Sequence, residues 1–229
     1  MVKTENTLKV ENEELAKSSA LIPLNMENKE FEMLMSLYEN AKNDIVQKLT
    51  IIQEYLKEVY EYDVVNHITS RIKTKESIVG KMKKKNYDMT YNELIEKVND
   101  IAGIRVICTF KSDIYKVIKI IHKIPNIRIL KEKDYIKNPK KSGYMGYHII
   151  LEDFIQYDDT YIPIKVEIQL RTMAMDFWAT TEHKIKYKKK YELSSKDSKK
   201  MKIYSKILNI IDDNIMKIYE KQLEGKIGK

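Results

Sequence analysis

Two segments of the chain carry acidic and basic side chains whose types and spacing could do phosphate chemistry. In the segment 162–172, apolar residues alternate with a polar row that consists of Lys165, Glu167, Gln169 and Arg171. In the segment 98–110, Asp100 precedes an apolar run that contains Arg105. The strict alternation and the β-branched residues predict that the segment 162–172 is a strand with its polar row on one face.

Asp100 and Glu167 would meet if these two segments are neighbouring strands. Two carboxylates about 4 Å apart repel by roughly 4 kcal/mol at an effective dielectric near 20. A shared proton or a cation offsets such a repulsion. A site with oxygen ligands and only two carboxylates suits Mg²⁺, which keeps several waters and takes further ligands from substrate phosphates.

Each segment also has a plainer interpretation. The alternating row is typical of the solvated outer face of a sheet, because charged side chains are mostly exposed. Asp100 by itself is more often a turn or capping residue than a ligand. Gly103 favours a site, because a residue without a side chain lets a ligand or a neighbouring backbone come close.

A cationic segment follows the first long helix. An expected strand over 64–73 ends in basic residues and leads into a helix that starts at Thr74 or Ser77. Free N–H groups and the helix dipole favour anions at such a start. A lysine run alone is usually a solvated face, so the candidates for phosphate binding are the specific set Arg71, Lys73, Ser77 and Lys81.

The segment 131–146 combines lysines, glycines, a proline and aromatic residues, including Lys140 and Tyr144. A basic, glycine-bearing loop can hold phosphates while an aromatic ring stacks on a base, a contact worth ~1–3 kcal/mol per base. The alternative is a plain surface connector.

The elements that position these residues follow from periodicity. Strands are expected at 64–73, 100–110, 127–130, 147–151 and 162–172, and helices at 28–62, 90–98, 112–123, 174–190 and 195–223. This order predicts an α+β fold with a central mixed sheet of about five strands flanked by helices. We expect a tail at 1–27, the main domain at 28–190, and a C-terminal helix at 191–229 whose heptad-like stripe favours an oligomer interface.

The composition points to phosphate-bearing partners. The net charge is +8 and the isoelectric point about 9.1, which favours nucleotides, RNA or an anionic membrane surface. Cys108 is the single cysteine, so no internal disulfide or cysteine metal cluster is expected. No apolar run reaches the ~18 residues of a membrane span, and the start of the chain is too polar for a signal peptide, so we expect a cytoplasmic protein.

Taken in order, these segments resemble the RelA/SpoT synthetase domain, most closely the stand-alone small alarmone synthetases. The resemblance covers roughly residues 64–188. It rests on SRIK at 70–73, DIAGIR at 100–105, the loop 133–148, and VEIQLRT at 166–172 with the helix that follows. It implies a nucleotidyltransferase-like fold and Mg²⁺-dependent transfer of the ATP pyrophosphoryl group to the ribose 3′-hydroxyl of GDP or GTP. AMP leaves and (p)ppGpp forms.

The resemblance also implies a role for each candidate. Asp100 and Glu167 hold Mg²⁺, and Glu167 takes the proton from the 3′-hydroxyl. Arg71 and Arg105 sandwich the adenine, and Tyr144 stacks on the guanine. The other candidates lie near the nucleotides, with Lys73, Ser77 and Lys81 on the ATP phosphates and Lys140, His148, Gln169 and Arg171 around the acceptor.

One departure from the family pattern concerns the acceptor. Met145 and Gly146 replace a polar pair, which leaves the preference among GMP, GDP and GTP open. The chain has no HD-type metal motif, so a synthetase without a hydrolase is expected. Small relatives form tetramers and some bind their product at a second site. The expected partners are therefore ATP, guanine nucleotides, other copies in a homotetramer and an allosteric (p)ppGpp, with no membrane and no nucleic-acid substrate.

Two other functions remain open at this level. A nucleotide- or RNA-binding protein could keep this fold without turnover, but it would have no need for both Asp100 and Glu167. Another nucleotidyltransferase of related fold would release pyrophosphate instead of AMP.

Overall fold

A five-stranded sheet forms the centre of the protein, whose computed structural model describes residues 23–187 and 194–227. The strand order is β1-β2-β5-β4-β3. The strands are β1 (Val65–Ile72), β2 (Ala102–Cys108), β3 (Ile127–Asp134), β4 (Tyr147–Tyr157) and β5 (Thr160–Thr172). Only the β2–β5 pair is parallel among these strands, which confirms the predicted mixed sheet. This pair places the segments 98–110 and 162–172 side by side.

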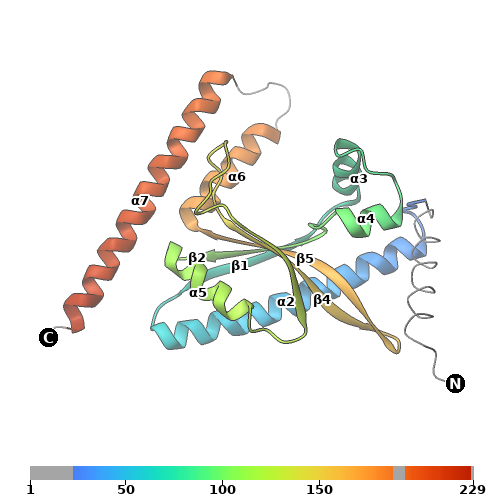
Figure 1. Ribbon diagram of the computed structural model, residues 1–229, viewed down its shortest axis with the longest axis horizontal. Coiled ribbons are helices and arrows are strands. Elements are labelled where there is room, and N and C mark those ends of the chain that lie inside the picture. Colours follow the sequence, from blue (N-terminus) through green and yellow to red (C-terminus); the bar gives the residue numbers. More distant parts are fainter. Residues whose placement is uncertain (1–22, 188–193, 228–229) are drawn as a thin grey trace.

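The helices are α2 (Lys29–Tyr60), α3 (Lys75–Lys84), α4 (Tyr91–Lys97), α5 (Lys111–Ile121), α6 (Met173–Tyr187) and α7 (Ser195–Ile227). The long helix α2 runs along one face of the sheet and contacts β1, β2, β4 and β5 (Figure 1). Asn28 caps its start by accepting a hydrogen bond from the Phe31 N–H, and Thr74 caps α3 in the same way. No helix among the described residues is long and apolar enough to cross a membrane.

The two faces of β5 have different environments. Its apolar row, which consists of Ile164, Val166, Ile168 and Leu170, is almost completely buried in the core beneath the sheet. Full burial of such side chains stabilises a fold by roughly 1.5–3 kcal/mol each, which fixes the register of the strand. The predicted polar row therefore lies on the opposite face, away from α2.

The middle of the chain differs from the sequence prediction. The strands expected at 127–130 and 147–151 are longer, and the loop expected at 131–146 begins only after Asp134. The pairing of β3 with β4 continues to Asp134 and Tyr147. Residues 131–134 are all charged, so they lack the apolar alternation that would predict a strand. Lysines are nevertheless common on the exposed edge of a sheet.

The C-terminal helix α7 lies beside α6 (Figure 1) and also contacts the end of β5 and the start of α5. The Trp178 indole donates to the Met201 carbonyl at 3.0 Å, and the Thr172 hydroxyl donates to Asp212 at 2.7 Å. Tyr219 stacks on Phe110. The stripe predicted on this helix is therefore divided between intramolecular contacts and exposed residues, which include Tyr204, Ile211, Ile215 and Ile218.

Most of the tail expected at 1–27 and the last residues of the helix expected at 174–190 lie outside the described part of the chain.

Candidate active site

The predicted site residues gather on the open face of the sheet. The register places Gly103 between Arg71 and Glu167, and it places Arg105 opposite Gln169. Two adjoining hollows of about 80 Å³ and 440 Å³ lie over these positions and share Arg71, Arg105 and Gln169 in their walls. Together they form one cleft rich in cationic side chains, with Asp100 and Glu167 in the smaller hollow.

Gly103 keeps the floor of the smaller hollow open. A Cβ atom at this position would meet nothing closer than the Arg71 carbonyl oxygen at 4.0 Å. The missing side chain therefore does not serve the packing of the protein. It leaves room beside Glu167, as expected for close approach of a ligand.

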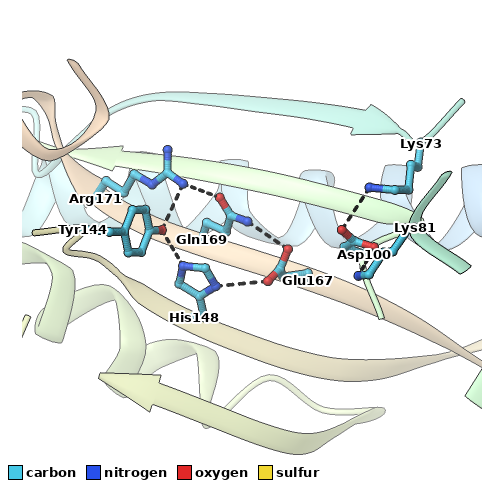
Figure 2. Close-up of polar contacts among 8 residues, drawn as sticks. All are labelled: Lys73, Lys81, Asp100, Tyr144, His148, Glu167, Gln169 and Arg171. Atoms are coloured by element: carbon cyan, nitrogen blue, oxygen red, sulfur yellow. Dashed lines mark hydrogen bonds and ion pairs between the residues drawn. The ribbon is translucent and has the colours of Figure 1, made fainter. Parts of the chain in front are cut away.

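Asp100 lies at the acidic end of the cleft between two lysines (Figure 2). Lys73 Nζ lies 3.1 Å from its Oδ2 atom, and Lys81 Nζ from α3 lies 2.8 Å from Oδ1. Burial by itself would raise the pKa of Asp100, but the two lysines bring it below its ordinary value. The carboxylate is therefore ionised at neutral pH, with both oxygens engaged.

Glu167 is held from two sides (Figure 2). Its Oε1 atom lies 3.0 Å from Nδ1 of His148 on the neighbouring strand β4, and its Oε2 accepts from Nε2 of Gln169 at 2.8 Å. Burial and the charge of Asp100 act to raise the pKa of Glu167, whereas His148 and Gln169 lower it, with a net value below the ordinary one. A buried carboxylate in this state can accept a proton from a substrate hydroxyl.

Arg171 connects the partners of Glu167. One terminal nitrogen donates to Gln169 Oε1 at 2.6 Å and to the Tyr144 hydroxyl at 3.0 Å. The other donates to Asp176 at 2.8 Å. The Tyr144 hydroxyl contacts Nε2 of His148, which completes a closed set of hydrogen bonds around Glu167 (Figure 2).

The structure thus brings most of the predicted residues together, but three differ from expectation in detail. Tyr144 is only 8% exposed, so its ring has no open face for a base in this conformation. Lys140 is exposed and lies over the Tyr135 and Tyr144 rings at 4.5 and 4.6 Å. Ser77 lies on the first turn of α3, where it bonds the N-cap residue Thr74.

Sequence reasoning missed Asp176 as part of the site. It is the carboxylate that holds Arg171, and it lies one turn into α6 after the strand that bears the arginine. A carboxylate shortly after a strand that ends in arginine was a usable signal, but nothing in the spacing required the two to meet.

The site has the composition of a phosphoryl-transfer centre. Lysines and arginines surround two carboxylates in a cleft, and such chemistry depends on positioning and neutralisation of charge instead of a protein nucleophile. The fold and the site therefore define a nucleotide-binding transferase.

Comparison with known proteins places the chain in a family. A family model described as "Region found in RelA / SpoT proteins" matches residues 70–192. The chain is also 37% identical over 193 residues to the GTP pyrophosphokinase YwaC of Bacillus subtilis, which covers 84% of this chain and 91% of YwaC. The chain belongs to the RelA/SpoT family.

Solved structures agree with this assignment. The small alarmone synthetase 1 of Bacillus subtilis bound to its product pppGpp superposes with a TM-score of 0.77 at 30% identity, over 85% of this chain and 98% of that chain. The same enzyme bound to AMPCPP superposes with a TM-score of 0.71 at 27% identity, over 86% of this chain and 100% of that chain.

Proposed function

We propose that this protein is a GTP pyrophosphokinase that synthesises the alarmone (p)ppGpp from ATP and GDP or GTP, with release of AMP. The observation that carries this function is the placement of Asp100, in the turn before β2, and Glu167, on the adjacent strand β5, in the wall of one cationic cleft. The names of the relatives support the same reaction. A protein that only bound nucleotides would gain nothing from two neighbouring carboxylates, because they repel phosphates.

The roles of the side chains follow from this reaction. Arg71 and Arg105 flank the cleft on neighbouring strands and would hold the adenine between their planar guanidinium groups. Lys73 and Lys81 would leave Asp100 for the ATP phosphates, with Ser77 near the same helix start. The acceptor would lie over the other end of the cleft, near Tyr144, Lys140, His148, Gln169 and Arg171.

Mg²⁺ is the proposed cofactor, and the residues present fit it. Asp100 and Glu167 offer carboxylate oxygens at one hollow, and the charge of Asp100 is felt at Glu167, which a divalent cation would relieve. Bound there, the metal would neutralise charge on the phosphates. In the chemistry of the chain itself, Glu167 would accept the proton of the ribose 3′-hydroxyl, which then attacks the β-phosphorus.

Further parts of the proposal concern partners and location. GMP is a third candidate acceptor, and Met145 and Gly146 stand where related loops carry a polar pair. The exposed apolar residues of α7 favour a homotetramer, with (p)ppGpp as a candidate allosteric ligand. We place the protein in the cytoplasm.

The test uses purified protein with Mg²⁺, γ-labelled ATP and GMP, GDP or GTP, resolved by thin-layer chromatography. We expect label on the guanine nucleotide and an equal amount of AMP, and neither product with the Glu167→Gln variant. Release of pyrophosphate would indicate a different nucleotidyltransferase. Absence of transfer, even after (p)ppGpp is added as an activator, would leave a nucleotide-binding protein without turnover.

A further inference from the structure

The hydrogen bonds around Glu167 form a closed ring in which the donor and the acceptor of each bond can be assigned. Two paths lead from the same nitrogen of Arg171 to the two oxygens of Glu167 (Figure 2). One passes through Gln169, and the other passes through Tyr144 and His148. Each residue in this ring is at least partly buried, so water competes little for these bonds.

The Gln169 path has only one consistent orientation. A guanidinium can only donate and an ionised carboxylate can only accept. The amide oxygen of Gln169 must therefore face Arg171, at 2.6 Å, and its NH₂ group must face Glu167, at 2.8 Å. Arg171 and Glu167 thus fix the amide from both ends.

The Tyr144 path selects a tautomer of His148. Arg171 donates to the Tyr144 oxygen at 3.0 Å, so the tyrosine proton is free to point at Nε2 of His148. A neutral imidazole that accepts at Nε2 carries its proton on Nδ1. That Nδ1–H group then donates to Glu167 Oε1 across 3.0 Å.

We propose that Arg171 is a positioning residue for Glu167, and that it acts through the Tyr144 hydroxyl and His148 on one side and through Gln169 on the other. The arginine does not touch Glu167 itself. Together with the carboxylate itself, it holds the proton on Nδ1 of His148 and the orientation of the Gln169 amide, so both donors point at the carboxylate and leave lone pairs free for the substrate hydroxyl. This inference rests on the proposed function, because it assigns Glu167 as the base.

Only an arginine suits this position. The side chain is 6% exposed, and its planar fork donates in several directions at once. A lysine ammonium could replace the charge, but it presents its donors from one nitrogen, whereas the bonds to Asp176 and to Tyr144 and Gln169 leave from two nitrogens of the fork. The buried Nε of Arg171 has no hydrogen-bond partner among the described residues, which is a cost that the remaining bonds must offset.

The inference gives the hydroxyl of Tyr144 a role separate from its ring. Tyr144→Phe keeps the aromatic face and the packing but removes the group that links Arg171 to His148. If the tyrosine served only to stack on a base, this variant would behave as wild type. We expect kcat to fall roughly tenfold to a hundredfold, as for a slightly misplaced catalytic group, with KM for ATP within about twofold of wild type.

Arg171→Lys should show the same pattern with a larger loss. The matched control is Arg128→Lys, which makes the same replacement at an arginine that bonds the Glu152 carboxylate elsewhere on the sheet. The control should keep wild-type kcat. Because Arg171 is buried, circular dichroism must show that its variant is folded, and Tyr144→Phe decides the question if it is not.

Nuclear magnetic resonance of ¹⁵N-labelled histidine tests the ring without turnover. The chain has four histidines, and loss of one signal in His148→Asn would identify the signal of this ring. We expect a proton on Nδ1 and none on Nε2 at pH 8 in wild type, and a shifted Nε2 resonance in Tyr144→Phe, because this nitrogen has lost the hydroxyl that donates to it. A bare Nδ1, two protonated nitrogens, or no change in the variant would overturn the inference.

These outcomes separate the inference from the proposed function. If the wild-type enzyme makes (p)ppGpp and both Tyr144→Phe and Arg171→Lys have the same kcat as wild type, the positioning role alone is refuted. A wild-type protein with the expected tautomer but no transferase activity would refute the proposed base role of Glu167, and with it the positioning role in catalysis.

Discussion

Lys81 Nζ lies 2.8 Å from Oδ1 of Asp100, so a proposed metal ligand is already paired with a proposed phosphate-binding lysine. Lys73 engages the second oxygen of the same carboxylate at 3.1 Å. A metal ion added alone must displace these ammonium groups. ATP phosphates would give the lysines a new partner, so metal and nucleotide should bind more tightly together than apart.

Removal of one lysine should therefore change the two ligands in opposite directions. We expect Lys81→Met to tighten the binding of Mn²⁺ alone by roughly three- to tenfold, as for the loss of a unit charge near 4 Å in a well-screened site, and to weaken ATP binding. Electron paramagnetic resonance of free Mn²⁺ measures the first effect. Lys83→Met, on the exposed side of the same helix, is the control; weaker Mn²⁺ binding in Lys81→Met would contradict the competition.

Glu167→Gln should abolish turnover and spare ATP binding. The amide is nearly isosteric but cannot accept the 3′-hydroxyl proton as a base, so we expect kcat to fall by at least about a hundredfold. Calorimetric titration with a non-hydrolysable ATP analogue should give a dissociation constant close to that of wild type. Retention of more than a few per cent of the wild-type rate would rule out the base role.

Tyr144→Ala should weaken binding of the acceptor far more than binding of ATP. The substitution removes the ring that is proposed to contact guanine, a loss of ~1–3 kcal/mol if the ring stacks. Because the ring is 8% exposed here, stacking also requires the loop to move. Steady-state KM values for both substrates provide the measurement, and equal losses for ATP and acceptor would refute the stacking assignment.

Gly143→Ala should destabilise the protein and disturb the acceptor loop. Gly143 has a φ of +97°, and a Cβ there would lie 2.9 Å from the Ser205 Cβ in α7. Strain of this kind costs about 1–3 kcal/mol. Gly80→Ala is the matched control, since a Cβ at that helical position meets nothing within 4 Å and alanine favours helix by about 0.5–1 kcal/mol. Urea unfolding of both variants tests the prediction, which fails if the two shift stability in the same direction.

Asp153 should make stability depend on pH near neutrality. Burial, together with the neighbouring Asp44 carboxylate, raises the pKa of Asp153 from 3.8 to about 6, although Lys48 opposes the shift at 3.1 Å. The folded protein therefore binds a proton that the unfolded chain has released, and this stabilisation is lost as pH rises through about 6.

Asp153→Asn has the same shape without the titration. The free energy of unfolding of wild type, relative to this variant, should fall by about 2–3 kcal/mol between pH 4 and pH 8. Thermal or urea unfolding at several pH values gives the difference. A constant difference across this range would show that Asp153 has an ordinary pKa.

The face on which each residue of β5 lies could be read from the sequence. Alternation with a period of two separates Val166 and Ile168 from Glu167 and Gln169, because burial of one face fixes the other. The apolar sequence of β2 favours an interior position in the sheet, but the sequence left open whether β2 is the neighbour of β5. The length of β3 was not predictable, because residues 131–134 are charged and only pairing with β4 makes them a strand.

The positions of the site residues were predicted better than their contacts. Spacing placed Glu167 and Arg171 on one face, but it could not show that Tyr144 and His148 come between them. Those bonds depend on how a loop folds back over the sheet, and Gly143 at positive φ and the Ser205 contact determine that path. Long-range contacts of this kind have no local signature.

The alternation of β5 also determines how its length can vary. A single inserted or deleted residue within Ile164–Arg171 would exchange the two faces beyond that point, so that charged groups enter the core while isoleucines line the cleft. Stability and chemistry would fail together. The turn at Asp158 and Asp159 contributes neither to the core nor to the cleft, because it is exposed and its neighbours Tyr157 and Thr160 pair only within the hairpin. Length changes among related chains should therefore collect at this turn and be absent from the strand.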